Sequence, residues 1–175
     1  MKKIFLIITV LIVSGTYLKI QSQNKTGAVM TNEIKTNKEI MNSGEKIFIE
    51  HADDCLALIE AEAQKLSIKG VAIMSFIPGD SSKSWISKMK VVGALTNEKA
   101  NFLGIASSKA AEMAETHINS GSGIREPKLG ELGYKGGVIK KVNGGYILAV
   151  FSGGKSEEDA AVSTKGLELL DKYYK

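Results

Sequence analysis

Two histidines, His51 and His117, are the side chains of this sequence best suited to bind a metal through an imidazole nitrogen. They are 66 positions apart and form no His-x-His or His-x-x-x-His pair, so the spacing indicates no zinc site with three or four convergent ligands. A haem iron needs one or two axial donors over an apolar groove, and His117 follows Met113 on an apolar helical face. Simpler interpretations are a helix-end residue for His117 and a solvated side chain for His51.

A glycine-rich turn, residues 153–156, stands where a phosphate-binding loop would lie, between a strand and a helix. The Walker pattern requires a glycine five positions before the second glycine of this turn, but Ala149 stands there, and residues 157–159 are all acidic. We therefore expect a capped helix start, with Ser156 as the N-cap and Asp159 at the capping-box position. The backbone amides of this turn leave room for one ligand carboxylate.

Local signatures of catalysis are absent from the sequence, which has no Gly-x-Ser-x-Gly and no His-Glu-x-x-His pattern. Its single cysteine, Cys55, cannot form an internal disulfide and lies on an apolar helical stripe. We expect a small buried side chain there and not a reactive thiol. The sequence therefore gives no local signature that assigns a catalytic reaction.

The glycine turn belongs to a β-hairpin followed by a helix. Two β-favouring runs, Val138 to Val142 and Tyr146 to Phe151, flank Asn143-Gly144, a pair that accepts the positive φ of a tight turn. The second run is apolar throughout, so we expect a central strand covered on both faces. A helix follows from Lys155 to Leu170.

The residues before this hairpin predict the same kinds of element in the order helix, strand, strand, helix. Apolar residues at steps of three and four, two β-favouring runs around Pro78-Gly79, and an alanine-rich stretch carry this prediction. The expected elements are a helix from Glu45 to Leu66, strands Val71 to Ile77 and Trp85 to Val92, and a helix from about Thr96 to Ile118. Together they predict an α+β domain in which an antiparallel sheet packs against helices, in the order α-β-β-α-β-β-α.

The start of the chain resembles a secretory signal, with a basic end and an apolar core of ten residues that is too short to span a bilayer. We expect a signal segment over residues 1–23, a polar linker over 24–43 and the folded domain over 44–175, in a secreted or periplasmic protein without a stable membrane span in the mature chain. The cleavage site is poorly defined at Ser22 or Gln23, so an uncleaved anchor is the alternative.

Loss of the signal segment would leave the protein close to neutral. Removing residues 1–23 reduces Lys plus Arg from 23 to 20 against 19 Asp plus Glu, and the net charge falls from +4 to +1. A protein with so small a positive excess lacks the phosphate-neutralising charge of a nucleic-acid binder. Nucleic acid is therefore excluded as a partner.

Four motifs in order carry a resemblance to a known family: residues 105–114 (IASSKAAEMA), 136–138 (GGV), 149–154 (AVFSGG) and 157–159 (EED). With the elements around them, from about Glu50 to Leu170, they resemble the HbpS/GlcG-like family of haem-binding proteins. The resemblance implies a profilin-like sandwich, assembly into homo-oligomers, and binding of haem or a related tetrapyrrole.

This chain departs from the family pattern at Ile139, Ser75 and Lys90, so the resemblance carries over no axial ligand. The candidates are therefore chosen by their chemistry. They are His117 or His51 as the iron donor, Lys90 and Lys109 as cationic partners for propionates, Met113, Gly136, Gly137, Gly153 and Gly154 as further cofactor-binding residues, and the 119–135 loop as a lid.

The expected function is thus that of an exported haem-binding protein in haem handling or in haem or redox sensing. Two alternatives remain open at this point. One is a small enzyme acting on haem or on a small organic acid, and the other is an oligomeric interaction module without a small ligand.

Overall fold

The computed structural model describes residues 30, 35–36 and 38–175. It divides into an N-terminal unit, Met1–Glu39, and a compact unit, Ile40–Lys175. The few described residues of the first unit are helical. The predicted signal segment, residues 1–23, lies outside the described residues.

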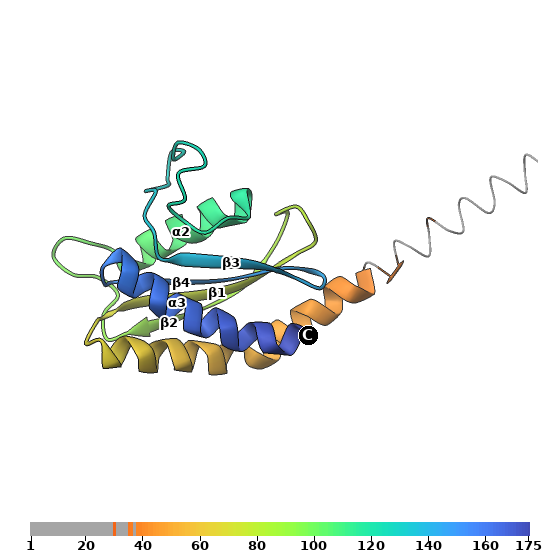
Figure 1. Ribbon diagram of the computed structural model, residues 1–175, viewed down its shortest axis with the longest axis horizontal. Coiled ribbons are helices and arrows are strands. Elements are labelled where there is room, and N and C mark those ends of the chain that lie inside the picture. Colours follow the sequence, from red (N-terminus) through yellow and green to blue (C-terminus); the bar gives the residue numbers. More distant parts are fainter. Residues whose placement is uncertain (1–29, 31–34, 37) are drawn as a thin grey trace, which may run out of the picture. The chain divides into compact units, whose positions relative to one another are not determined.

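A four-stranded antiparallel sheet forms the centre of the compact unit (Figure 1). Its strands are β1 (Gly70–Pro78), β2 (Ile86–Val92), β3 (Gly137–Val142) and β4 (Gly145–Ser152), in the spatial order β2-β1-β4-β3. Each hairpin pairs its own two strands, and β1 and β4 join the hairpins in the middle of the sheet. The prediction of a central apolar strand is confirmed, because β4 lies in the middle of the sheet with seven of its eight residues buried. All nine residues of β1 beside it are buried too.

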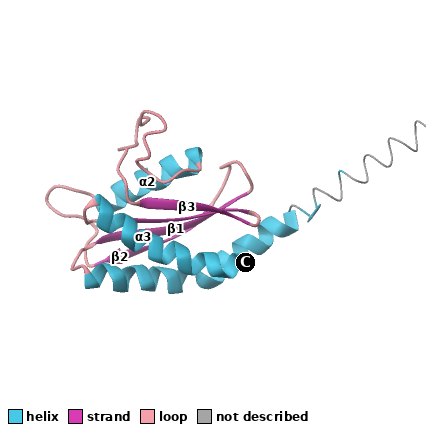
Figure 2. Ribbon diagram, viewed as in Figure 1, coloured by secondary structure: helices cyan, strands magenta, loops and turns pink. Residues whose placement is uncertain are grey.

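Helices cover both faces of this sheet (Figure 2). One face packs against the first helix, which covers residues 40–65 of this unit, and against α3 (Ser156–Asp171); a short 3₁₀ turn, η1 (Lys172–Tyr174), ends the chain. The other face packs against α2 (Phe102–Thr116). Because side chains alternate across a strand, β1 supplies both cores: Ala72, Met74 and Phe76 to the first, Val71, Ile73 and Ile77 to the second.

The amphipathic stripe of the first helix is buried as expected, with Phe48, Ala52, Cys55 and Ile59 all fully inaccessible. Burial, with a smaller contribution from Asp54, raises the pKa of the Cys55 thiol to about 11. The prediction that Cys55 is a small core side chain is therefore confirmed.

The α+β class and the order α-β-β-α-β-β-α are confirmed, while two boundaries differ from expectation. Residues 40–43, predicted to belong to a polar linker, are helical, and Ile40 and Met41 are half-buried. Helix α2 begins at Phe102 and not near Thr96, because the Asn101 side chain caps it by accepting from the Gly104 N–H at 3.0 Å. In the described part of the chain, no helix is long and apolar enough to cross a membrane.

Candidate ligand-binding clefts

Two clefts lie at opposite ends of helix α2. The His117 cleft, about 660 Å³, lies between residues 80–85 and the C-terminal half of α2. The Lys109 cleft, about 440 Å³, lies between the N-terminal half of α2 and the turn from β4 into α3. The clefts also lie at opposite ends of the sheet. Ser152 lines the Lys109 cleft and pairs with Val71 near the start of β1, whereas Asp80 lines the His117 cleft and follows the end of β1.

His117 ends helix α2 in a left-handed conformation with φ of 55°, and its backbone N–H donates to the Met113 carbonyl at 2.8 Å. Its ring stacks on Tyr146, with centroids 4.0 Å apart and planes inclined by 12°. The Nε2 atom is buried and has no hydrogen-bond partner within the described residues. The prediction of a helix-end residue is confirmed, and one imidazole nitrogen is left buried without a partner.

The remaining walls of the His117 cleft combine an indole, small apolar side chains, three serines, one cation, and two acids, Asp80 and Glu115, that already pair with other cations. Trp85 is 43% exposed, Ala111 and Ala114 come from α2, and Lys83 lies on the loop. The Ser82 hydroxyl donates to the Ala114 carbonyl and ties this loop to α2. The arrangement suits a flat, largely apolar ligand with an acidic edge.

The floor of the Lys109 cleft is a buried ion pair. Lys109 and Asp159 are 3% and 5% exposed, and the Lys109 Nζ lies 2.8 Å from the Asp159 Oδ2. The Lys109 ammonium also donates to the Phe151 carbonyl at 2.9 Å, and the Gly154 N–H donates to the Asp159 Oδ1 at 2.8 Å. Burial raises the pKa of Asp159, while Lys109 and the backbone N–H groups of residues 153 and 154 oppose the rise.

Gly136 packs directly over this ion pair. A Cβ at that position would lie 2.7 Å from the Lys109 Nζ and 2.6 Å from the Asp159 Cβ, so a larger residue would displace the pair. The Ser163 hydroxyl donates to the Gly136 carbonyl at 2.7 Å and fixes the segment in place.

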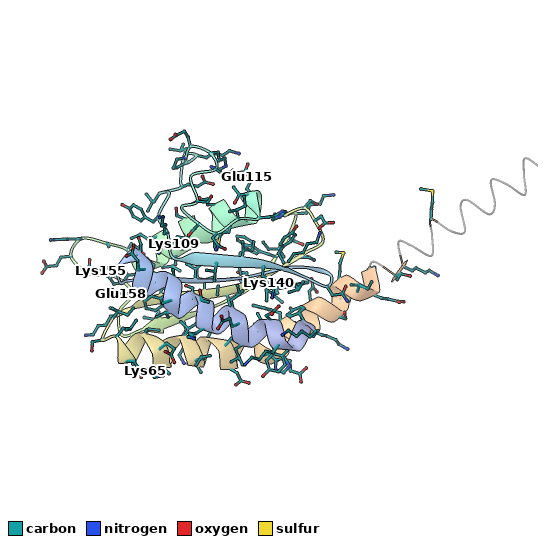
Figure 3. All side chains as sticks on the ribbon, in the orientation of Figure 1. Lys65, Lys109, Glu115, Lys140, Lys155 and Glu158 are labelled. Atoms are coloured by element: carbon teal, nitrogen blue, oxygen red, sulfur yellow. The ribbon has the colours of Figure 1, made fainter. Side chains whose placement is uncertain are left out.

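The start of helix α3 differs from the predicted cap. Lys155, and not Ser156, is the N-cap residue, and Glu158 accepts from the Lys155 N–H at 2.8 Å. Asp159 is directed instead to Lys109. The predicted N-cap was wrong by one position. Residues 157–159 are all acidic, and their spacing alone does not tell which carboxylate accepts from the N-cap N–H. Figure 3 shows Lys109, Lys155 and Glu158 together at this end of the domain.

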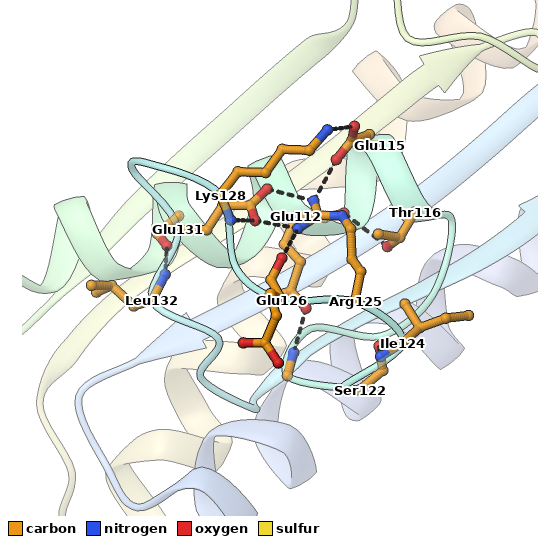
Figure 4. Close-up of polar contacts among 12 residues, drawn as sticks. Glu112, Glu115, Thr116, Ser122, Ile124, Arg125, Glu126, Lys128, Glu131 and Leu132 are labelled. Carbon is orange, nitrogen blue, oxygen red and sulfur yellow. Dashed lines mark hydrogen bonds and ion pairs between the residues drawn. The ribbon is translucent and has the colours of Figure 1, made fainter.

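The loop between α2 and β3 is fastened to α2 by charged side chains (Figure 4). Arg125 donates to both carboxylate oxygens of Glu131, at 2.7 and 2.8 Å, and also pairs with Glu115 on α2. Lys128 pairs with the same Glu115, and its backbone N–H donates to Glu131. These contacts lower the pKa of Glu131 from 4.5 to about 2, and the hydrogen bond from Arg125 is the largest cause. The loop expected to be a lid is thus held on α2, and Tyr134 and Lys135 at its end line the Lys109 cleft.

The chain matches no protein-family model, and no curated protein sequence matches it. The resemblance to HbpS/GlcG-like proteins therefore stays a prediction, and the function has to be argued from the two clefts.

The structure does not bring the predicted iron donors together. His51 belongs to the first helix, on the opposite face of the sheet from α2, and stacks on Tyr173 with ring centroids 3.6 Å apart. Lys90 lies on that face too, where it forms an ion pair with Glu60 at 2.6 Å. The sheet separates His117 from both His51 and Lys90, so the two histidines stay alternatives as the donor, and Lys90 can accompany only His51. No cluster of three or more potential ligands is present among the described residues.

The other predicted residues divide between the core and the Lys109 cleft. Met113 is fully buried in the core under α2, and a Cβ on Gly137 would lie 3.0 Å from its sulfur, so both support the fold. Lys109, Gly153 and Gly154 do line one cleft. Lys109 precedes His117, which lines the other cleft, by 8 positions in the sequence. Sequence reasoning missed five aromatic and lysine residues that line the clefts, because isolated side chains of these types in loops carry no motif: Lys83, Trp85, Tyr134, Lys135 and Lys155.

Proposed function

We propose that the protein binds haem or a related tetrapyrrole in the His117 cleft, with the imidazole of His117 as the iron donor. The observation that carries the proposal is the buried, unpaired Nε2 of His117 at the wall of a cleft of about 660 Å³. Buried polar atoms normally have a partner, so a nitrogen without one points to a ligand. A haem iron needs one such donor, whereas a zinc site needs three or four.

The side chains around His117 suit each part of such a ligand. Trp85 and the alanine surface of α2 offer apolar contact to a ring face, and the Lys83 ammonium offers a partner to a propionate. Stacking on Tyr146 holds the plane of the imidazole. What the group supplies is a redox-active iron, which suits haem handling or redox sensing.

Access to the donor nitrogen requires a local opening, because Nε2 is covered in the present conformation. We assign this opening to the 79–85 loop, which is exposed from Asp80 to Trp85 and is tied to α2 by the bond from Ser82 to the Ala114 carbonyl. Export through the predicted signal segment would place this binding protein outside the cytoplasm.

Hemin titration of the purified protein, followed by the Soret band, tests the proposal. We expect a saturable shift that is lost in His117→Ala and kept in His51→Ala, the matched histidine on the opposite face of the sheet. Iron-free protoporphyrin should still bind His117→Ala, because the cleft remains while the donor is gone. A Soret shift equal in both variants, or no saturable shift in the unaltered protein, would refute the proposed site.

A further inference from the structure

We propose that the Lys109 cleft is a second binding site, for a small organic acid with one carboxylate and a short apolar or aromatic body. This site is independent of the tetrapyrrole proposal, because it lies at the other end of α2 and shares no lining residue with the His117 cleft.

The charge of the lining favours an anion. Lys109, Lys135 and Lys155 line the cleft together with one acid, Asp159. The two carboxylate oxygens of Asp159 already accept from the Gly154 N–H and from Lys109. Lys135 and Lys155 have no ion-pair partner among the residues that the structure describes. Two uncompensated cations therefore stand at the rim of the cleft, with Glu158 nearby but engaged by the Lys155 N–H.

The floor of the cleft adds a further donor. A lysine ammonium carries three N–H donors. Lys109 uses two of them, toward Asp159 and the Phe151 carbonyl. Since the side chain is 97% buried, its third N–H has little access to bulk water, and a ligand oxygen in the cleft would satisfy it.

The remaining wall selects the class of anion. Phe102, Ile105 and Tyr134 give one side of the cleft an apolar and aromatic surface. An inorganic phosphate would gain nothing from this surface. The Gly154 and Lys155 N–H groups do not serve its oxygens, because both already donate to acidic side chains. A carboxylate with a short apolar body uses both the cations and the wall.

Benzoate is the probe for this site, with benzamide as its neutral analogue and inorganic phosphate as an anion without an apolar body. In ¹H–¹⁵N spectra of the intact protein, we expect benzoate to cause saturable shifts at residues 153–156 and 134–135, and benzamide and phosphate to cause weak or no shifts there. Saturable shifts with benzamide equal to those with benzoate, or none with benzoate, would overturn the proposal.

Substitutions at the exposed rim give a second test that does not endanger the fold. Lys135→Gln/Lys155→Gln should weaken benzoate binding about tenfold, because it removes both unpaired cations at the rim of the cleft. The matched control, Lys46→Gln/Lys172→Gln, removes two exposed lysines on the other side of the sheet and should leave the affinity unchanged. Equal affinities in the two double variants would contradict the site. Hemin titration of the same variants should be unaltered, so failure here is distinguishable from failure of the tetrapyrrole proposal.

Discussion

At the level of single residues, the Lys109–Asp159 pair is a buried ion pair that joins α2 to α3. Both side chains are almost completely buried, and each has a backbone partner as well. Removing one partner of a buried pair leaves an uncompensated charge. Lys109→Met should therefore lower the free energy of unfolding by about 3 kcal/mol, measured by urea denaturation.

Two comparison variants separate this effect from a general loss of lysine. Lys65 forms an exposed pair with Glu62 one helical turn away, so Lys65→Met should cost less than about 1 kcal/mol. Adding Asp159→Asn to Lys109→Met should restore part of the stability, because the buried charge is then removed while an oxygen still faces the Gly154 N–H. Equal losses for Lys109→Met and Lys65→Met would show that the pair is not structurally important.

Residue types were readable from the sequence, but the face on which each side chain lies was not. His51 and His117 are chemically equivalent candidates in the sequence, and the sheet between them is what decides that they belong to different sites. The same limit applies to Asp159. Its position in the sequence predicts a helix cap, whereas in the folded protein it accepts from Lys109, 50 positions away. Long-range pairing of this kind has no local signal.

At the level of elements, two helical glycines with identical local propensity should respond oppositely to alanine. A Cβ on Gly104 of α2 would meet the Asn101 side chain at 3.6 Å, an ordinary contact, whereas a Cβ on Gly166 of α3 would collide with Ile59 of the first helix. Gly104→Ala should raise the free energy of unfolding by about 0.5 to 1 kcal/mol, through helix propensity. Gly166→Ala should lower it by about 1 to 3 kcal/mol, through overpacking.

Thermal and urea unfolding of Gly104→Ala, Gly166→Ala and the unaltered protein measure the two changes in the free energy of unfolding. A stabilising effect at both glycines would mean that α3 does not approach the first helix as closely as the structure has it.

The loop between α2 and β3 should loosen at acid pH. The pKa of Glu131 is lowered in the folded state, so its ionised form adds stability above pH 4.5, and this contribution is lost as the pH falls toward 2. A ¹³C titration of the Glu131 carboxyl should give a midpoint near 2, with faster amide exchange in residues 121–132 across the same range. Arg125→Gln removes the main cause and should move the midpoint back toward 4.5. A midpoint near 4.5 in the unaltered protein would contradict the network.

The element order was predictable because each strand and helix carries its own periodicity, and the Asn143-Gly144 turn carries its own chemistry. The residues at which the elements begin and end were less predictable. Helix α2 starts at Phe102 because Asn101 caps it, whereas the alanine and charged residues before that cap are equally compatible with a helix by composition.

At the level of the whole molecule, the two clefts are local features of a unit without a strong overall field. Residues 40–175 contain 17 Lys plus Arg and 17 Asp plus Glu, so their net charge is zero. Ligand selection by this unit therefore has to come from the few charges that line each cleft: Lys83 with Asp80 and Glu115 in one, and three lysines with Asp159 in the other.

The limits of the folding unit give a last prediction. A fragment starting at Ile40 should unfold with the same free energy as the full chain, because the compact unit begins there. A fragment starting at Glu45 lacks half-buried Ile40 and Met41 and the Gly44 carbonyl that accepts from the Tyr174 hydroxyl at 2.7 Å. We expect it to lose about 2 kcal/mol in urea unfolding, from one hydrogen bond and the apolar surface no longer covered. Equal stability of the two fragments would instead place the start of the domain near residue 44, as the sequence pattern predicts.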